Sequence, residues 1–292
     1  MSGAAWAALS GVGFGLFQAL NARAVRDLDS VYASTFLQLL LASVVLAAAS
    51  LATEDVSALG DASAWAIIAF ALAGMVHFFL GWTTLNLSQA RIGAARTSPL
   101  LSTTPLFGLL FAAALASQVP GGPAIAGVAL TIVGAYLVAD PGGGRRAPLS
   151  DSSFALATAC AWSGSAVLTL EGLEELDSPL LGVTVGMLAA ATAYGALLAL
   201  SPGPVRLFAG SRDALLLKLI AGLVVALATW GRWVALDDAT VAVVLALNLL
   251  SVPVVLIVAP IISGRHVEVV TRKIWAGAAL VIAGSLLLII RE

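Results

Sequence analysis

Long apolar runs separated by short polar gaps alternate along the whole chain. A helix needs about 20 mainly apolar residues to cross roughly 30 Å of hydrocarbon. Runs of about this length predict ten membrane-spanning helices, at residues 4–22, 31–52, 63–85, 92–115, 123–139, 152–170, 179–200, 214–236, 240–262 and 273–290. The pattern therefore predicts an all-α polytopic membrane protein.

The composition agrees with this fold class. Hydrophobic residues make up 60% of the 292 residues and charged residues 10%, whereas about 25% of a soluble domain is charged. The net charge of −2 offers no basic patch, so a nucleic-acid partner is not expected. Because Cys160 is the single cysteine, an internal disulfide and a multi-cysteine metal site are excluded. We expect no cofactor or metal.

The chain contains its main elements twice. Residues Gly127–Gly134 match Gly277–Gly284 at an offset of 150, sharing Gly, Ala, Leu, Ile and Gly in register. An offset of 148 pairs Leu101 with Leu249, Pro105 with Pro253, Phe14 with Trp162, Gly74 with Gly222 and Trp82 with Trp230. We therefore predict two five-helix repeats, residues 1–140 and 152–292, joined by a linker at 141–151. Since each repeat has an odd number of spans, the two would be inverted relative to each other, as in many secondary transporters.

The expected span at 92–115 differs from an ordinary lipid-facing helix. It carries Arg96 and several hydroxyl residues, and its prolines Pro99 and Pro105 free backbone carbonyls. Freed carbonyls are tolerated at this depth only beside protein or a polar cavity. We therefore expect a site along this span and along its counterpart at 240–262.

These features together resemble the EamA-type transporters of the drug/metabolite transporter superfamily: ten spans, two repeats, paired Pro-bearing spans and paired Gly-bearing spans. The resemblance covers nearly the whole chain. It implies a substrate cavity near the bilayer centre, lined by both repeats, with alternating access and no covalent chemistry. Members commonly carry a glutamate between the Pro-bearing and Gly-bearing helices. The first half has Ser117 there, and the second has Glu268 only approximately in that place.

Polar and aromatic residues inside the expected spans mark the faces that would line such a cavity. In the sixth span, Trp162, Ser165 and Thr169 recur at helical spacing on one face. Alternatively, the small hydroxyl residues on this face serve only to let helices pack closely. The predicted substrate-binding residues are His77, Trp162, Ser165, Arg96, Asn248, Asn21, Gln18, Thr169 and Trp230.

Three of these residues admit a second interpretation. An imidazole in hydrocarbon leaves a donor and an acceptor to satisfy, so His77 is either a ligand contact or proton carrier, or is bonded by a neighbouring helix. A charge at the centre of a span costs about 2.5–3.5 kcal/mol on insertion scales. Arg96 therefore indicates a cavity, unless it reaches the membrane surface. Trp230, beside Arg232, is either a site residue or an interfacial anchor.

No Asp or Glu lies near the centre of an expected span. A lipophilic cation would need such a carboxylate as its counter-ion, so a small polar or zwitterionic, amino-acid-like metabolite is the expected substrate. We expect a secondary transporter of the cell (inner or plasma) membrane, not an enzyme, acting as a monomer or homodimer in the lipid bilayer. A membrane-embedded enzyme or a channel is the alternative. Against an enzyme, the histidines His77 and His266 are far apart in sequence and form no metal motif.

Basic residues indicate an orientation. Counting residues at span edges, including Arg96 and Lys218, with the adjacent loops, most Lys and Arg follow odd-numbered spans. The positive-inside rule then makes those loops cytoplasmic and places both termini outside. The family resemblance implies cytoplasmic termini instead, and both orientations stay open.

Cysteine labelling distinguishes the two orientations. In a variant whose native Cys160 is replaced by alanine, Gly143→Cys should resist a membrane-impermeant maleimide in intact cells if the charge bias governs. It should become labelled once the membrane is permeabilised. Labelling in intact cells would show that the family expectation holds.

Overall fold

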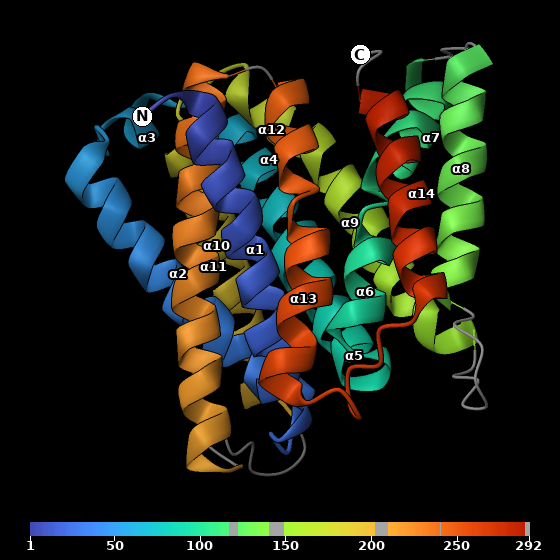
Figure 1. Cartoon of the computed structure of the whole chain (residues 1–292). Coiled ribbons are helices and arrows are strands. Elements are labelled where there is room, and N and C mark those ends of the chain that lie inside the picture. The colour runs from blue at the N-terminus through green and yellow to red at the C-terminus, as the bar shows by residue number, and fades with distance from the viewer. Residues whose placement is uncertain (117–121, 140–148, 202–209, 240, 290–292) are drawn as a thin grey trace.

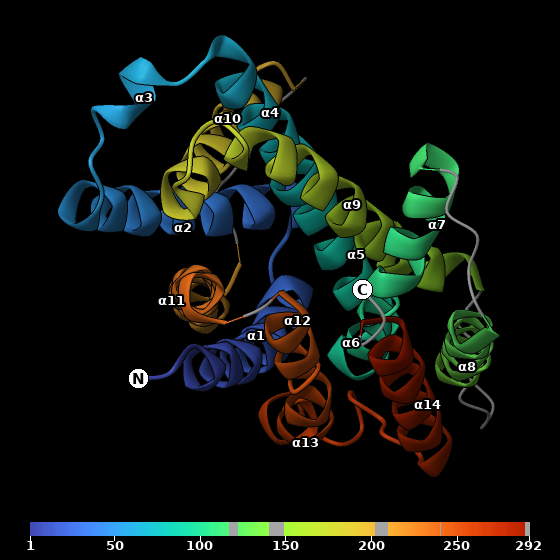
Figure 2. The same ribbon diagram turned by 90° about the horizontal axis from the view of Figure 1, so that it is seen from above.

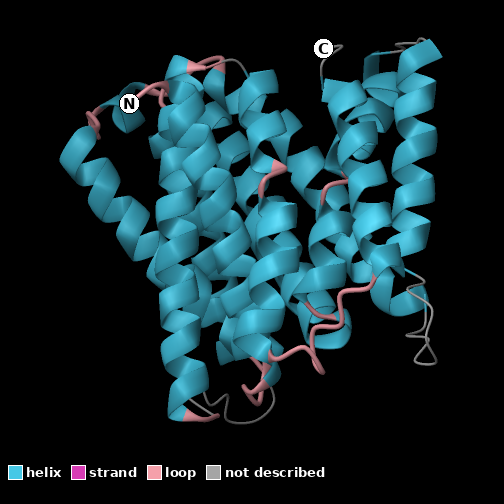
Figure 3. Cartoon of the chain, in the orientation of Figure 1, coloured by secondary structure: helices cyan, strands magenta, loops and turns pink. Residues whose placement is uncertain are grey.

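The computed structural model describes residues 1–116, 122–139, 149–201, 210–239 and 241–289, and nearly all of them are helical (Figures 1 and 3). The elements are α1 (Gly3–Arg26), α2 (Val31–Thr53), α3 (Ala58–Asp61), α4 (Ala64–Gly74), the π-helix η1 (Met75–Gly81), α5 (Trp82–Ile92), α6 (Ala94–Leu101), α7 (Thr104–Ala116), α8 (Gly122–Ala139), α9 (Leu149–Leu173), α10 (Pro179–Ala199), α11 (Arg212–Asp238), α12 (Val241–Asn248), α13 (Ser251–Ser263) and α14 (Arg272–Ile289). The predicted all-α fold class is confirmed.

Nine helical segments among the described residues are long and apolar enough to cross a membrane, and they correspond to nine of the ten expected spans. The remaining expected span, at 92–115, is occupied by α6 and α7, each too short to cross a bilayer alone. Both termini lie at the same end of the bundle (Figure 1). An even number of crossings requires this arrangement, and ten crossings stay a prediction.

The two Pro-bearing spans are broken. α6 ends at Leu101 and α7 begins at Thr104, just before Pro105, whose ring disfavours a helical conformation in the preceding residue. In the second span, α12 ends and α13 begins shortly before Pro253. The carbonyl of Ser102, freed by the first break, accepts a hydrogen bond from the Ser285 hydroxyl of α14 at 2.5 Å. At this break, a neighbouring helix satisfies the freed carbonyl.

The third span extends beyond its hydrophobic run. The expected end at residue 85 is wrong, because the helix passes through the wide turn of η1 and continues in α5 to Ile92. Asn86 and Gln89 therefore lie inside the bundle, and both are fully buried. Their side chains bond to other polar side chains, which makes a polar helical segment tolerable at this depth.

Helices of the two halves pack crosswise (Figure 2). α1 lies along α11, α9 lies along α4, η1 and α5, and α8 pairs with α14. In the last pair, Gly127 contacts the backbone of Gly284, and Gly134 contacts the backbone of Gly277. The predicted repeat matches Gly127 with Gly277 and Gly134 with Gly284. Gly127 thus contacts the repeat counterpart of Gly134, and Gly134 contacts the repeat counterpart of Gly127. An approximate two-fold axis between the two repeats would produce this exchange. The division into two inverted repeats stays a prediction that this contact supports.

A core of aromatic and aliphatic side chains holds α1, α2, η1, α5, α10 and α11 together. It includes Phe17, Phe78, Trp82, Met187 and Tyr194, all buried. The core joins helices of both halves, so it fixes their relative positions around the polar residues described below.

Gly74→Ala should destabilise the fold, because a Cβ at this position would overlap the backbone of Gly186 where α4 crosses α10. Overpacking costs about 1–3 kcal/mol, so the unfolding midpoint in detergent should fall by several degrees. Gly60→Ala is the matched control, since no atom lies within 4 Å of the added carbon. Equal midpoints for the two variants would contradict the close contact between α4 and α10.

Candidate functional site

His77, Trp162, Ser165 and Thr169 meet where η1 packs against α9. The His77 ring stacks on the Trp162 indole, with ring centroids 5.3 Å apart and planes 12° apart. Its Nδ1 lies 2.9 Å from the Ser165 hydroxyl, and the Thr169 hydroxyl donates to the Ser165 carbonyl at 2.9 Å. The neighbouring helix therefore satisfies one nitrogen of His77 through Ser165 and stacks Trp162 on its ring, and Thr169 follows one turn further along the same face of α9.

The Trp162 indole lies between His77 and Gly81. A Cβ at Gly81 would be 2.7 Å from the indole Nε1, so only glycine leaves room for the ring. Nε1 is buried and has no hydrogen-bond partner among the described residues. Trp162 and Trp230 are both partly buried and pack against the same central core. These two predicted residues therefore contribute aromatic surface at the junction of the two halves.

A second cluster joins α1, α2, α5 and α11 through a fully buried lysine. The Nζ of Lys218 donates to the Asn21 amide oxygen and, at 2.6 Å, to the Gln38 amide oxygen. The Asn21 amide nitrogen donates to the side-chain oxygens of Asn86 at 2.5 Å and Gln89 at 2.6 Å. All five residues are 0% exposed. We name these five residues the amide network.

The amide network reaches further along α1 and α2. The Asn86 amide donates to the Thr35 hydroxyl of α2 at 2.7 Å. Gln18 lies one helical turn from Asn21 and is buried, and its Oε1 has no hydrogen-bond partner in the described part of the chain. The sequence prediction thus located Asn21 and Gln18 beside a polar cluster whose remaining members it did not include.

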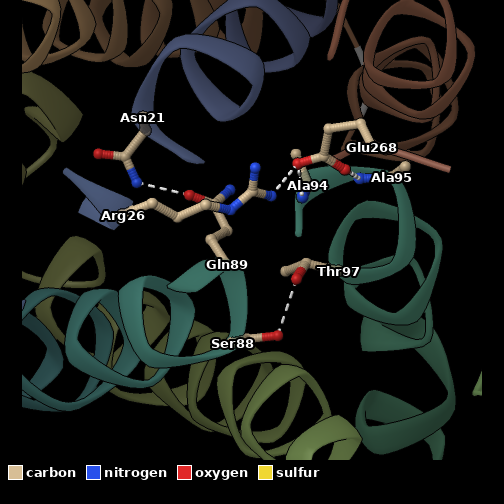
Figure 4. A network of polar contacts seen from close by, with 8 residues as sticks. All are labelled: Asn21, Arg26, Ser88, Gln89, Ala94, Ala95, Thr97 and Glu268. Carbon is tan, nitrogen blue, oxygen red and sulfur yellow. Dashed lines mark hydrogen bonds and ion pairs between the residues drawn. The ribbon is translucent and has the colours of Figure 1, made fainter. Parts of the chain in front are cut away.

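A third contact links the loop before α14 to α6 (Figure 4). The buried carboxylate of Glu268 accepts hydrogen bonds from the backbone N–H groups of Ala94 at 3.0 Å and Ala95 at 3.1 Å. It also forms an ion pair with Arg26 at the end of α1. A carboxylate at this place satisfies two unpaired N–H groups and the positive end of the α6 dipole. Glu268 therefore ties the second half to both α1 and α6.

The backbone at Gly93 makes this contact possible. Its φ of +80° is rarely adopted by residues with a side chain, and a Cβ there would lie 2.6 Å from a Glu268 carboxylate oxygen. A hydrogen bond of 2.8 Å between Ser88 and Thr97 holds α5 and α6 together beside it (Figure 4). α6 thus begins in a geometry that only glycine and a partner carboxylate permit.

Arg96 and Asn248 contact other elements. The Arg96 guanidinium donates to the carbonyls of Val138 at 3.4 Å and Ala139 at 2.5 Å, at the end of α8, where a cation complements the helix dipole. Asn248 is the last residue of α12, and Gly11 of α1 packs against its backbone. The structure therefore brings His77, Trp162, Ser165 and Thr169 together and joins Asn21 to the amide network, whereas Arg96 lies against α8.

The model of the EamA-like transporter family matches residues 1–139. This segment, just under half of the 292-residue chain, is therefore similar to the EamA-like transporter family. The chain is a polytopic membrane protein, as the resemblance implied, and its first half matches a transporter family.

Comparison with solved structures shows that the fold extends over both halves of this EamA-like protein. A chain whose title reads only "Crystal structure of protein" is 18% identical, with a TM-score of 0.62, covering 97% of this chain and 99% of that one. At this identity the likeness shows the fold alone. No curated protein matches the sequence significantly.

Sequence reasoning missed four members of the amide network in this EamA-like protein. Counting Lys218 with a loop was wrong: α11 begins at Arg212, so Lys218 lies inside it and is fully buried. Arg96 was likewise counted with a loop and is buried in α6. Lys218 and Gln38 are each flanked by leucines on both sides, a signal that a polar side chain needs an internal partner.

Glu268→Gln should lower the stability of this EamA-like protein, because glutamine keeps the size of the side chain but removes the charge that Arg26 and the α6 N-terminus require. Hydrogen bonds to a charged group contribute roughly 1.5–3 kcal/mol, so the unfolding midpoint should fall by several degrees. The control is Asp27→Asn, which removes only the exposed pair with Arg23 and should change stability by at most about 1 kcal/mol. Equal shifts would show that Glu268 does not tie the halves together.

Proposed function

We propose that this protein is a secondary transporter that moves a small polar or zwitterionic, amino-acid-like metabolite across the cell (inner or plasma) membrane by alternating access. The observation that carries the proposal is the set of buried polar contacts that joins the two halves at one end of the bundle. At this end α1 finishes and α11 begins (Figure 1). The proposal includes no covalent chemistry.

The chemistry of these contacts suits an end that closes and opens. The amide network links α1, α2 and α5 to α11, and Glu268 links α1 and α6 to the loop before α14. Hydrogen bonds between neutral groups in this set add about 0.5–1.5 kcal/mol each, and those to charged groups roughly 1.5–3 kcal/mol, and water can replace them when the end opens. Alternating access requires contacts that hold one end closed and separate when the other end closes.

His77 and Trp162, which we name the aromatic cluster, support a substrate of moderate size with an apolar part. His77 and Trp162 are partly exposed and lie beside the central core rather than within it. Stacked aromatic surface with a few polar atoms is typical of small-molecule sites. Within the described spans no carboxylate is buried, and Glu268 lies in a loop. These features favour a polar or zwitterionic solute over a lipophilic cation.

His77→Ala and Trp162→Ala should each reduce transport while leaving the protein folded. Losing about 1.4 kcal/mol of substrate contact corresponds to a tenfold loss of affinity, so counterflow of labelled amino acids in proteoliposomes should fall by about that factor. Trp65→Ala is the matched control, because Trp65 is 48% exposed on α4. Wild-type counterflow in both site variants would show that the aromatic cluster does not bind substrate.

A further inference from the structure

Two basic side chains lie on one face of α11. Lys218 and Arg232 are 14 positions apart, which in an α-helix places them within roughly 40° of each other around the axis and about 21 Å apart along it. α11 begins at the end closed by the amide network and finishes at the end where α1 begins (Figure 1). Lys218 is six residues after the start of α11, and Arg232 is six residues before its end. The helix thus presents a cation toward each side of the membrane.

Lys218 has only neutral partners. Its ammonium donates to the amide oxygens of Asn21 and Gln38, is fully buried, and contacts no carboxylate in the part of the chain that the structure describes. An ammonium has three donors, so the amides leave its charge uncompensated. Buried Lys and Arg are rare unless they are paired.

Arg232 is more unusual still. No hydrogen bond or ion pair joins its guanidinium to another residue in the described ranges, although it is only partly exposed. Arg232 follows two residues after Trp230, which packs against the same core as Trp162. An arginine near a candidate site that has no counter-ion among the described side chains has donors available for a ligand.

Helix packing does not require these charges. At the repeat offset of 148, the counterparts of Lys218 and Arg232 are Phe70 and Thr84. Phe70 is buried in an apolar cluster, and the Thr84 hydroxyl bonds to Thr158 at 2.8 Å. Only the second half therefore carries cations at these places, so their presence calls for a reason beyond the fold.

The central core separates the two cations. Ala221 and Val225 lie between them on the same face of α11 and belong to the same buried core as Phe17 and Phe78. A solute bound near Arg232 therefore does not reach Lys218 until the halves move. In this structure the Lys218 end is closed by the amide network.

We propose that the transported solute carries an anionic group, a carboxylate or a phosphate. Arg232 binds this group at one end of the bundle. Lys218 binds it when the other end, which the amide network closes, has opened. This inference rests on the proposed transport function and names the charge of its substrate. Arg232 would act through bidentate hydrogen bonds to the anion. Lys218 would exchange its amide partners for the anion as the network separates.

The first experiment screens purified protein for thermal stabilisation by amino acids, hydroxy acids, sugar phosphates and uncharged sugars, because a bound ligand raises the unfolding midpoint. Stabilising compounds should carry a carboxylate or a phosphate, and which of the two classes stabilises identifies the group. The carboxamide of a stabilising acid, or the dephosphorylated form of a stabilising phosphate, should have no effect. Stabilisation by uncharged compounds alone would overturn the inference.

The second experiment uses variants with the best compound of that screen. Arg232→Gln should weaken stabilisation and proteoliposome uptake about tenfold or more, Arg232→Lys less so, and the exposed control Arg212→Gln not at all. Lys218→Met should lower the maximal uptake rate more than the apparent affinity, with Lys218→Arg as the variant that keeps the charge. Normal uptake by Arg232→Gln would overturn the inference but leave the transport function standing. Absence of uptake of every solute class by wild-type protein would overturn the transport function itself.

Discussion

Inside the hydrocarbon, a polar group that loses its partner has no water to replace it, and this constraint explains each irregular feature of the bundle. The break between α6 and α7 frees the Ser102 carbonyl, and Ser285 of α14 binds it. The start of α6 frees two N–H groups, and Glu268 binds them. The end of α8 leaves carbonyls that Arg96 binds. In each case the partner comes from another element, so satisfying the backbone and assembling the helices are one process.

The amide network extends this principle to side chains. The side chains of asparagine and glutamine both donate and accept hydrogen bonds, so each can bond to two neighbours at once and link residues of several helices. Asn21 does so between Lys218 and the amides of α5. An apolar seam would hold equally well but would expose apolar surface to water on opening, whereas amides can bond to one another when buried and to water when exposed. This property connects the local chemistry of α1, α2, α5 and α11 to a transport cycle.

Much of the fold could be predicted from the sequence, because a membrane-spanning helix is recognised from the apolar character of about 20 consecutive residues alone. The prolines also indicated that backbone carbonyls are freed in the span at 92–115, and helical spacing placed Trp162, Ser165 and Thr169 on one face of the sixth span. The sequence could not show which polar side chains bond to one another. Asn86 and Gln89 look like loop residues by hydropathy, and only Asn21 and Thr35, more than 50 positions earlier, make their burial tolerable. The partners of Arg96 could not be predicted for the same reason, since the carbonyls that it binds lie at the end of α8.

The wide turn of η1 makes the two halves unequal. A π-helix fits more residues into each turn than an α-helix, so Met75–Gly81 is wound differently from the corresponding stretch of α11, which is continuous from Arg212 to Asp238. Two halves that exchanged conformations during a cycle would have to rewind one helix and unwind the other. The free-energy difference between those windings would then act as a built-in bias, so that the protein rests with one particular end closed before any solute arrives.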